Sequence, residues 1–351
     1  MERPYILITG GAGFIGTNIA RRYLTEDRPV HIFDNLDRSG VEQNVTELLR
    51  HYPGRVQFTH ADVRDRAAVE KAVSGAGAVY HLAAQVAVTT SLEDPLADLA
   101  TNLMGTLHLL EAIRNVATKP SLLFTSTNKV YGRLASVALH ERPTRHEPAD
   151  GSLARLGADE RQPLEFLSPY GCSKGSADQY VLDYARSFGI QAAVFRMSCI
   201  YGPYQLGSED QGWVAHFLRQ ALKGEPITIY GDGKQVRDLL FVEDLVDAML
   251  RVQENMPIAA GEAFNVGGGP ENSSSLLELI SEIELLTGSS VIVDRGPERL
   301  ADQRWFVADT SKIRKLVGWS PRIGVREGLR ALQNWYVGRP LLLAQSEVQV
   351  A

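Results

Sequence analysis

The sequence has little of three things: cysteine, basic charge and long apolar runs. Its 351 residues include only two cysteines, Cys172 and Cys199, which excludes a disulfide framework and suits a reducing compartment. The formal net charge is −6, so the chain has no general attraction to nucleic acid or to an anionic membrane. No apolar run reaches transmembrane length, and the first residues lack a signal-peptide pattern. We therefore expect a cytoplasmic protein with no nucleic-acid partner and no membrane partner.

A short strand followed by a glycine-rich turn organises the rest of the chain. Tyr5 to Ile8 form an apolar run, and Gly10, Gly13 and Gly16 follow before a predicted helix. Gly10 would make the tight turn, Gly13 would let the backbone approach a pyrophosphate, and Gly16 would let helix and strand pack closely. The free N–H groups at the helix start suit phosphate oxygens. Three glycines with this spacing can also form a turn that binds no ligand. The residues around the turn therefore decide whether it binds a dinucleotide.

Two carboxylates supply that context. Asp34 ends the second predicted strand, where a dinucleotide fold places an acid that accepts the ribose hydroxyls of adenosine. Such an acid repels a 2′-phosphate, so the sequence favours NAD over NADP. Asp62 follows the third predicted strand and would hold the adenine amino group, cap the helix predicted from Ala67, or do both.

Strands and helices alternate through the first half of the chain. Strands are predicted near residues 5–8, 30–33, 56–58, 78–82 and 121–127, with a long helix over 96–116. This pattern predicts an α/β fold with a Rossmann-like, doubly wound parallel sheet and ligands at the carboxyl ends of its strands. We expect a NAD-binding domain over 1–195 and a smaller C-terminal α/β substrate lobe over 196–340, with some segments returning to the first domain. An insertion near 133–167 suggests a lid or an oligomer contact, and residues after Pro340 suggest a loose tail.

A second motif, Tyr170-Gly171-Cys172-Ser173-Lys174, opens another predicted helix. Residues four apart share a helix face, so the Tyr170 hydroxyl and the Lys174 ammonium would point into one cleft. The ammonium and the positive ring of a bound nicotinamide would lower the pKa of Tyr170 from about 10 and so make a general base. Thr127 ends the fifth predicted strand and would hydrogen-bond the same substrate oxygen. A surface tyrosine and lysine is the structural alternative for this motif alone.

Together these motifs resemble the extended short-chain dehydrogenase/reductase family, which contains nucleotide-sugar epimerases and dehydratases. The resemblance runs from Ile6 to about Trp335. It implies tightly bound NAD, which oxidises a sugar carbinol and later reduces the ketone, and a catalytic set of Thr127, Tyr170 and Lys174. The motifs and the resemblance together predict the residues that bind the cofactor. These are Gly10, Gly13, Phe14, Ile15, Gly16, Asp34, Asn35, Arg38, Asp62, Val63, Leu82, Ala83, Ala84, Asn102, Tyr170, Lys174 and Arg196.

The residues after Thr127 narrow the subgroup. Family members that eliminate water carry an acid pair where this chain has Asn128 and Lys129, because dehydration needs a carboxylic acid and a carboxylate. The resemblance therefore disfavours dehydration, and Lys129 also counts against sugar-acid decarboxylation. The stretch 126–132 is similar to the CDP-paratose 2-epimerases, also called CDP-tyvelose 2-epimerases. Further similar blocks lie at 34–38, 85–91, 168–180, 210–214, 233–238 and 302–309.

This resemblance implies a nucleotide-sugar substrate in the second half of the chain. Arg237 and Arg304 suit its pyrophosphate, because a guanidinium fork matches two phosphate oxygens; ion pairs with Asp238 or Asp302 are the structural alternative. Trp213 either stacks on the base or belongs to the core. The expected substrate-binding residues are Gln85, Thr89, Asn128, Lys129, Gln211, Arg237 and Arg304.

The expected reaction is inversion at C2 of a CDP-sugar by transient oxidation. Both C2 and CDP come from the resemblance alone, so a 4-epimerase, a 2-epimerase of another nucleotide sugar and a non-catalytic NAD-binding regulator stay open. We expect a homodimer or homotetramer paired through the helices around Leu96 and Tyr180. No metal is expected, because His51, His60, His140 and His146 do not have the sequence spacing of a set of metal ligands.

Overall fold

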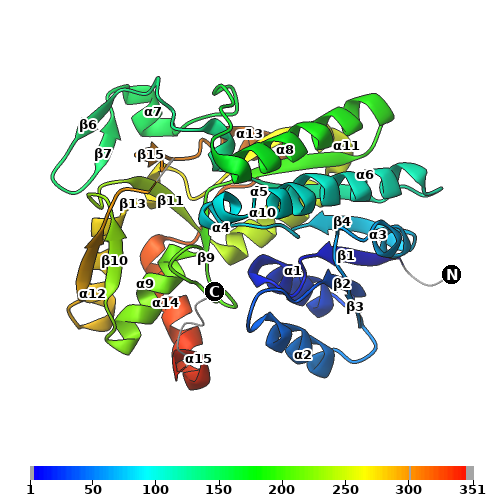
Figure 1. The fold of residues 1–351 in the computed structure, drawn as a ribbon, viewed down its shortest axis with the longest axis horizontal. Helices are drawn as coiled ribbons and strands as arrows, with labels where there is room; N and C mark the ends of the chain where they lie inside the picture. Colours follow the sequence, from blue (N-terminus) through cyan, green and yellow to red (C-terminus); the bar gives the residue numbers. More distant parts are fainter. Residues whose placement is uncertain (1–3, 300–301, 345–351) are drawn as a thin grey trace.

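A parallel sheet of seven strands forms the centre of the molecule (Figure 1). The computed structural model describes residues 4–299 and 302–344. The strand order is β12-β8-β5-β4-β1-β2-β3, so β1 lies between β2 and β4 and the sheet extends in both directions from the strand before the glycine turn. The bounds are β1 Tyr5–Thr9, β2 Val30–Asp34, β3 Val56–His60, β4 Ala76–His81, β5 Ser121–Thr127, β8 Ala192–Met197 and β12 Ala263–Val266.

Helices cover both faces of this sheet, each through an apolar stripe. One face is packed by α1 Phe14–Thr25, α2 Val41–His51 and α10 Val242–Glu254, with α11 Met256–Ala259 and α13 Ser311–Val317 beside them. The other face is packed by α3 Arg66–Val73, α6 Gly105–Asn115 and α8 Ser168–Phe188. The predicted doubly wound α/β class is confirmed.

The helix predicted over 96–116 is interrupted. After α4 Val88–Glu93, the chain forms α5 Pro95–Leu99, a π-helical turn Ala100–Met104, and then α6. The π turn contains Asn102, whose side chain bonds both the loop after β4 and α8. Single π turns inside helices often lie at functional sites, and a helical apolar pattern alone does not reveal them.

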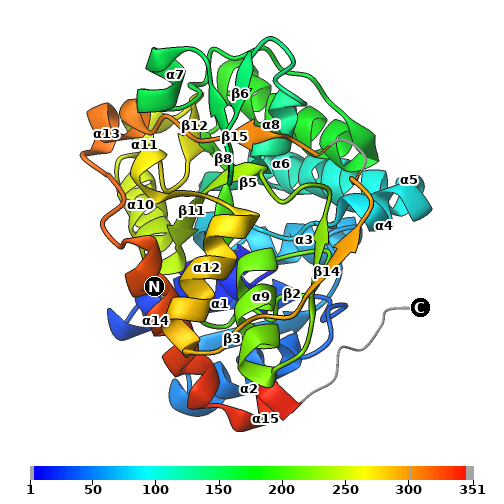
Figure 2. The same cartoon turned by 90° about the vertical axis from the view of Figure 1, so that its left-hand side faces the viewer.

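A smaller lobe packs beside one end of the main sheet (Figure 2). Its four-stranded sheet contains β9 Cys199–Tyr201, β11 Val236–Phe241, β13 Ser273–Ser275 and β15 Trp305–Phe306, and β10 Ile227–Tyr230 pairs with β14 Val293–Gly296. The lobe helices are α9 Trp213–Lys223, α12 Leu276–Thr287, α14 Val325–Val337 and α15 Pro340–Ala344, and a 3₁₀ turn spans Pro270–Asn272. β12 returns to the main sheet beside β8. The domain division at residue 195 stays a prediction.

The stretch from Phe195 to Tyr201 belongs to two strands. β8 ends at Met197, and β9 leaves the main sheet to pair with β11 in the lobe. Ser198 marks the change: its N–H donates to Val266 O at 2.9 Å, while its hydroxyl donates to Asp238 O at 3.1 Å. One apolar run therefore serves two sheets.

The insertion near 133–167 is an arm fastened to the lobe. It forms β6 Leu139–Glu141, β7 His146–Pro148 and α7 Gly151–Leu156. Lys234 Nζ bonds Glu141 at 2.6 Å, Arg145 donates to Ser273 Oγ at 3.0 Å, and Ala158 N donates to Val307 O at 2.7 Å. The expected loose tail is also wrong as far as residue 344, because α15 packs on α9 and α14; the part of that prediction over 345–351 lies outside the described residues.

Candidate active site

The glycine turn links β1 to α1 in the way that its spacing predicted. Gly10 has φ +69°, and a Cβ there would lie 2.7 Å from Ala83 N. A Cβ on Gly16 would lie 2.6 Å from Gly10 O, so this glycine lets α1 begin directly against the turn. A Cβ on Gly13 would meet nothing in the protein nearer than Gly10 O at 3.3 Å. Gly10 and Gly16 are thus required by the fold, and a Cβ on Gly13 would crowd the turn.

Polar groups gather at the carboxyl ends of β2 and β3. Asp34 accepts hydrogen bonds from Ala12 N at 3.0 Å and Leu36 N at 2.8 Å, which places its carboxylate against the glycine turn. Asn35 donates to Asp62 Oδ2 at 2.9 Å. Hydrogen bonds from Arg64 hold the pKa of Asp62 at about 2. Asp62 therefore stays charged, and the alternative that it caps α3 is wrong, because Asp65 makes that cap through Ala68 N.

The segment after β4 closes the other side of the glycine turn. Leu82 N donates to Thr9 O at 3.0 Å, and Ala83 packs against Gly10 with Ala84 next along the chain. Asn102 holds this segment by accepting from Gln85 N at 2.9 Å and donating to Gln85 O at 3.1 Å. Val63 is buried where it meets Gly105 of α6. The structure gives Asn102 and Val63 these supporting contacts, and their cofactor contact stays a prediction.

The structure brings together the three residues predicted to be catalytic. Thr127 ends β5, and its Oγ1 accepts from Lys129 N at 3.2 Å in the 3₁₀ turn Asn128–Tyr131. Tyr170, in the first turn of α8, is hydrogen-bonded to Thr127. Lys174, one turn later, donates from Nζ to Thr125 O at 2.6 Å and lies 4.3 Å from the ring centre of Phe124. All three side chains are buried.

The pKa of Tyr170 is raised in the chain without NAD, and the lowered pKa expected beside a bound nicotinamide ring stays a prediction. Burial raises the pKa of Tyr170 to about 12, and the hydrogen bond with Thr127 opposes this only in part. Burial also lowers the pKa of Lys174 to about 7, although Asp178 and Asp98 oppose the change. Desolvation outweighs the charge effect because Lys174 is turned toward Thr125 O. Tyr170 therefore rests as a phenol, and a phenolate needs additional positive charge.

Arg196 lies behind the catalytic turn. Its guanidinium makes a two-pronged pair with Asp178 at 2.9 Å and donates to Tyr131 Oη at 3.1 Å. Tyr131 in turn donates to Asn265 Oδ1 at 2.7 Å. These contacts join β8, α8 and β12 and occupy the polar end of Arg196. Its predicted contact with the cofactor stays a prediction.

Basic side chains converge on Asp302 at the edge of the lobe. Arg237 Nη2 lies 2.8 Å and Lys129 Nζ 3.2 Å from Asp302 Oδ1. Burial raises the pKa of Asp302, but Arg237 and Lys129 outweigh it and hold the pKa below its usual range. Burial lowers the pKa of Lys129, with Asp302 opposing and both Arg237 and Arg299 adding to the effect. The ion pair between Arg237 and Asp302, which was the structural alternative, is thus present. It belongs to a cluster in which Lys129, Arg237 and Arg299 surround this one carboxylate.

The neighbouring residue, Gln303, braces the catalytic turn. Its Nε2 donates to Gly132 O at 2.6 Å, and its Oε1 accepts from Asn128 Nδ2 at 3.1 Å. Asn128 is therefore next to Thr127 but turned toward the lobe. Arg304 is exposed and, with Asp302, lines a cavity of about 90 Å³. Its predicted contact with a pyrophosphate stays a prediction.

The remaining predicted residues lie around the mouth of the site. Arg38 donates a hydrogen bond to Gln211 Oε1, which joins a cofactor-side loop to a substrate-side loop. Gln85 Oε1 and Thr89 Oγ1 are buried and have no hydrogen-bond partner among the residues that the structure describes. Buried polar atoms are normally paired, so these two oxygens suit a polar ligand. Trp213 packs edge-on against Phe217 in the lobe core, which favours the core alternative.

The sequence analysis gave no role to Arg299 or Gln303, and it gave Asp302 only as the ion-pair alternative for Arg237 and Arg304. Arg299 lies 4.1 Å from the ring centre of Tyr230 and 3.2 Å from Asp210, and Gln303 and Asp302 form the brace and the anion of the cation cluster. The run 299–304 carries two arginines and a carboxylate, which is a usable signal for anion binding. Its partners, however, are more than sixty residues away in sequence, and local spacing does not reveal them.

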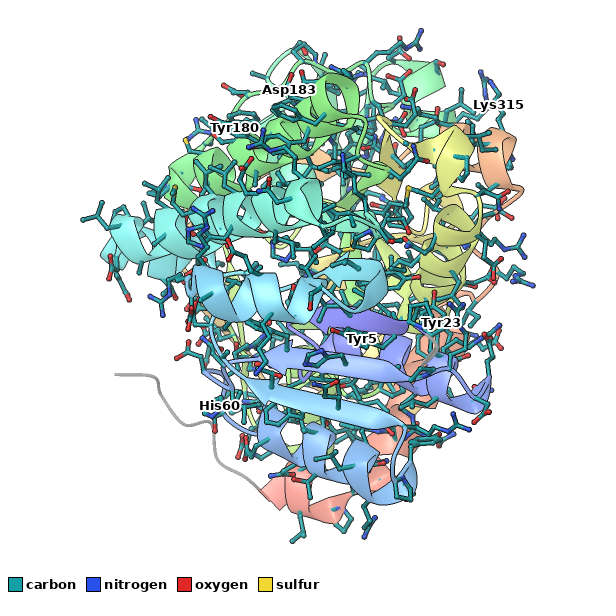
Figure 3. All side chains as sticks on the ribbon, turned by 90° about the vertical axis from the view of Figure 1, so that its right-hand side faces the viewer. Tyr5, Tyr23, His60, Tyr180, Asp183 and Lys315 are labelled. Carbon is teal, nitrogen blue, oxygen red and sulfur yellow. The ribbon has the colours of Figure 1, made fainter. Side chains whose placement is uncertain are left out.

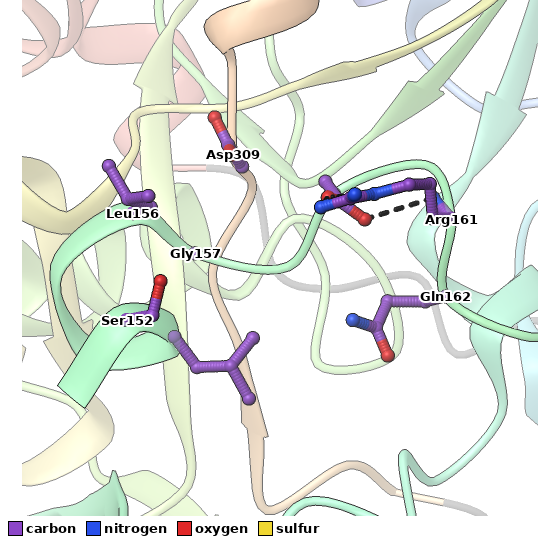
Figure 4. A pocket seen from close by; sticks show the side chains of 8 residues that line it. Ser152, Leu156, Gly157, Arg161, Gln162 and Asp309 are labelled. Atoms are coloured by element: carbon purple, nitrogen blue, oxygen red, sulfur yellow. Dashed lines mark hydrogen bonds and ion pairs between the residues drawn. The ribbon is translucent and has the colours of Figure 1, made fainter. Parts of the chain in front are cut away.

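Another hollow lies away from this site. Figure 4 shows it between α7 and the segment around Asp309, with a volume of about 430 Å³. Asp159 and Arg161, both on its wall, pair with each other. No group of histidine, cysteine, aspartate or glutamate side chains within residues 4–299 and 302–344 has the arrangement of a metal site. No helix in those ranges could span a membrane.

The residues at the glycine turn fit a dinucleotide. A Cβ on Gly13 would crowd Gly10 O at 3.3 Å, no side chain among the described residues caps the N-terminus of α1, and the Asp34 carboxylate lies beside the same turn. Phe14 and Ile15 form the first helical residues there. A helix start without a cap offers N–H groups and a positive dipole end to phosphates. The donor set therefore matches NAD in kind and in position.

The family model described as "GDP-mannose 4,6 dehydratase" matches residues 7–332. The chain belongs to this family of extended short-chain dehydrogenase/reductases. It is 41% identical over 337 residues to a CDP-paratose 2-epimerase of Salmonella typhi, covering 94% of this chain and 98% of the relative.

Two solved structures extend this comparison. A UDP-glucuronic acid 4-epimerase of Bacillus cereus, in complex with UDP-glucuronic acid and NAD, has a TM-score of 0.81 and 28% identity, covering 95% of this chain and 99% of that one. A dTDP-glucose 4,6-dehydratase of Streptomyces venezuelae with NAD bound has a TM-score of 0.82 and 27% identity, covering 95% and 97%. The family is thus one of NAD-dependent enzymes that act on nucleotide sugars, and the predicted resemblance is confirmed.

Proposed function

We propose that this protein is a NAD-dependent epimerase that inverts C2 of a CDP-sugar, interconverting CDP-paratose and CDP-tyvelose. The observation that carries the proposal is the 41% identity to a CDP-paratose 2-epimerase over 94% of the chain. The site adds independent support, because Asn128 and Lys129 follow Thr127 and no carboxylic acid stands there to assist loss of water. Lys129 is instead engaged with Asp302.

The cofactor-binding residues act through position. Asp34 would accept the adenosine ribose hydroxyls, the start of α1 at Gly13 to Gly16 would face the pyrophosphate, and Asn35 with Asp62 would lie near the adenine. When bound, NAD supplies the reversible oxidation of a sugar carbinol to a ketone. The positive charge of its oxidised ring is the additional charge that the resting Tyr170 lacks.

The catalytic residues then move one proton in each direction. Tyr170 Oη takes the proton from the sugar hydroxyl as the carbinol is oxidised, and returns it when the ketone is reduced on its opposite face. Thr127 Oγ1 accepts the Lys129 N–H at 3.2 Å and donates to Asn128 Oδ1 at 3.3 Å, and rotation of this hydroxyl would transfer its proton from Asn128 to the substrate oxygen. Lys174 supplies the nearby positive charge. Inversion results if the keto-sugar turns over between the two steps, so the pocket must accept two sugar orientations.

The substrate-binding residues surround that pocket. Arg237, with Arg299 and Arg304, would take the pyrophosphate, because the cluster around Asp302 has surplus positive charge. Gln85 Oε1 and Thr89 Oγ1, unpaired among the described residues, would accept sugar hydroxyls in either orientation. Asn128, Lys129 and Gln211 would complete the wall.

The test is proton NMR of the purified protein with no added cofactor, incubated with CDP-, UDP-, GDP- and dTDP-sugars. We expect inversion at C2 of CDP-tyvelose or CDP-paratose without net oxidation. Inversion at C4 of another sugar would keep the chemistry and overturn the substrate assignment. No turnover of any sugar by a protein that retains NAD would favour a non-catalytic NAD-binding regulator.

We also propose that the protein is a homodimer, or a homotetramer made of two such dimers, in the cytoplasm. Leu96 of α5 is 76% exposed, and Tyr180 of α8 is 44% exposed on a neighbouring helix. Figure 3 shows Tyr180 on the outward face of α8. Leu92, Leu99 and Met104 extend this apolar face, and such a patch is typical of an interface. Both cysteines are free, which suits a reducing compartment.

Substitution of Leu96 tests the interface. The change Leu96→Glu would place a carboxylate in the centre of the apolar face and is expected to shift the protein to monomers in sedimentation velocity. Leu285→Glu, at an equally exposed leucine on the lobe, is the matched control and is expected to leave the assembly unchanged. A wild-type protein that sediments as a monomer would refute the proposal.

A further inference from the structure

A buried carboxylate that the mechanism above does not use lies beside the catalytic turn. Asp98 of α5 is 0% exposed. It accepts a hydrogen bond from Asn102 Nδ2 at 3.0 Å and another from the Ser173 hydroxyl. No lysine or arginine nitrogen among the described residues lies within ion-pairing distance, 4.0 Å, of its oxygens. An ionised carboxylate so placed requires a nearby positive charge that is not in direct contact.

The hydrogen bonds fasten Asp98 to the catalytic turn itself. Ser173 lies between Tyr170 and Lys174 in α8, and its hydroxyl is also 3.2 Å from Tyr170 O. Asn102 Nδ2 reaches Ser173 Oγ at 3.1 Å, so the three side chains form a closed triangle. The π-helical turn that interrupts the helix after α5 contains Asn102. The irregular backbone therefore lies where it brings α5 to the catalytic turn.

Charged and titratable groups from several elements surround the Lys174 ammonium. The Lys174 ammonium contacts Thr125 O and the ring of Phe124, both on β5. The titratable groups near the ammonium are Tyr170 and Asp178 of α8, Asp98 of α5 and His81 of β4. Arg196 of β8 is linked to this group through Asp178. Asp178 is committed to Arg196 by two hydrogen bonds of 2.9 Å. Asp98 is the remaining carboxylate of this group.

We propose that Asp98 is a positioning residue for epimerisation, which holds the Tyr170–Lys174 turn through Ser173 and, together with Asp178, supplies negative charge near the Lys174 ammonium. This assignment rests on the proposed function for its catalytic meaning, but the charge pairing itself does not depend on any substrate. Asp98 touches neither Tyr170 Oη nor the reacting atoms; it acts through Ser173 and through its charge.

The pKa directions agree with this geometry. Burial lowers the pKa of Lys174 to about 7, and Asp178 and Asp98 oppose that change. Burial raises the pKa of Asp98, and Ser173 and Lys174 oppose it. If Asp98 loses its charge, the pKa of Lys174 falls further, and the ammonium is lost at neutral pH.

The experiment titrates Lys174 in the protein without NAD or substrate. The chain has eight lysines, so ¹³Cε-lysine labelling gives a spectrum simple enough to assign with one Lys174→Arg sample. In Asp98→Asn, we expect the pKa of Lys174 to fall by about one pH unit, because an opposite charge nearby favours the ionised form by that order. Ser173→Ala keeps the charge and loses the hydrogen bond, so its pKa is expected to stay closer to the wild type. Asp94→Asn, at the exposed cap of α5, is the matched control with no shift.

The outcomes separate this proposal from a purely structural role and from the proposed function. An unshifted Lys174 in Asp98→Asn overturns it. Should that variant not fold, ¹³Cγ spectra of the wild-type aspartates decide instead: a protonated Asp98 at neutral pH overturns the proposal, and an ionised one supports it. In activity assays, Asp98→Asn is expected to lower kcat more than KM changes, with partial recovery at lower pH. A Lys174 shift in a protein that turns over no sugar would support the charge pairing and refute the function.

Discussion

The two sides of the active site are built differently. On the side of the main sheet, Thr127, Tyr170 and Lys174 lie on adjacent elements, are buried, and are held by short contacts to the backbone such as Lys174 to Thr125 O. On the side of the lobe, Lys129 and Arg237 are charged and mostly buried, and both pair with Asp302 across long separations in sequence. In the proposed function, the first side would transfer a proton with fixed geometry. The second would redistribute its charges when an anionic substrate binds.

The largest expected effect is on the main-sheet side. The change Tyr170→Phe removes the only atom proposed to move the proton and is expected to lower kcat by about 1,000-fold, the scale of general acid–base catalysis. Tyr180→Phe, ten residues along the same helix and exposed, is the control and should retain activity. The measurement is turnover by NMR, together with the NAD content of each protein. Retained activity in Tyr170→Phe would dismiss the assignment of the base.

An intermediate effect is expected on the lobe side. The change Arg237→Met removes a guanidinium from the cluster at Asp302 and is expected to raise KM by about 10- to 100-fold with a smaller change in kcat, as for loss of a charge-assisted bond. Arg304→Met, at an exposed arginine nearby, is expected to raise KM by only about threefold, because a solvated contact is worth little. Equal effects of the two changes would contradict the contrast between a buried cluster and an exposed rim. Initial rates across substrate concentrations measure both.

The smallest expected effect is on the stability of the main sheet, through two buried histidines. Burial lowers the pKa of His31 to about 4 and that of His81 to about 3. Both values lie below the unfolded value of about 6.5, so the unfolded chain binds protons first and stability is lost as the pH falls below about 6.5. Relative to His31→Gln, the wild-type free energy of unfolding should lose about 1.4 kcal/mol more per pH unit between about pH 6 and 4.5. Denaturant titrations at several pH values test this, and parallel curves would contradict it.

The sequence predicted the features that depend on local patterns, and it did not predict those that depend on contacts between distant residues. The glycine turn, the alternation of strands and helices, and the spacing of Tyr170 and Lys174 are local patterns, and the structure places each where the pattern predicted. The π-helical turn at Asn102 was not predicted, because its cause is a set of contacts to Gln85 and Ser173 rather than local preference. Burial raises the pKa of Tyr170 in the chain without NAD, and motif spacing carries no information on that burial.

The lobe side shows the same limit more strongly. The sequence offered both Asp238 and Asp302 as ion-pair partners for Arg237, and the structure selects Asp302. The brace formed by Gln303 was not predicted, because it depends on a segment that returns beside the catalytic turn. The roles of the individual binding residues stay predictions, as does the boundary at residue 195. The insertion near 133–167 is fastened by pairs such as Lys234 with Glu141, and nothing in its composition specified those partners.

The measurement that tests the central claim most directly is the fate of a deuterium at C2 of CDP-tyvelose during turnover in ordinary water. Transient oxidation within one active site predicts that the CDP-paratose formed retains the deuterium at C2 and that no ketone or reduced cofactor accumulates. Release of the deuterium to solvent would mean that the carbon is inverted by exchange of an acidic proton, and would contradict the account.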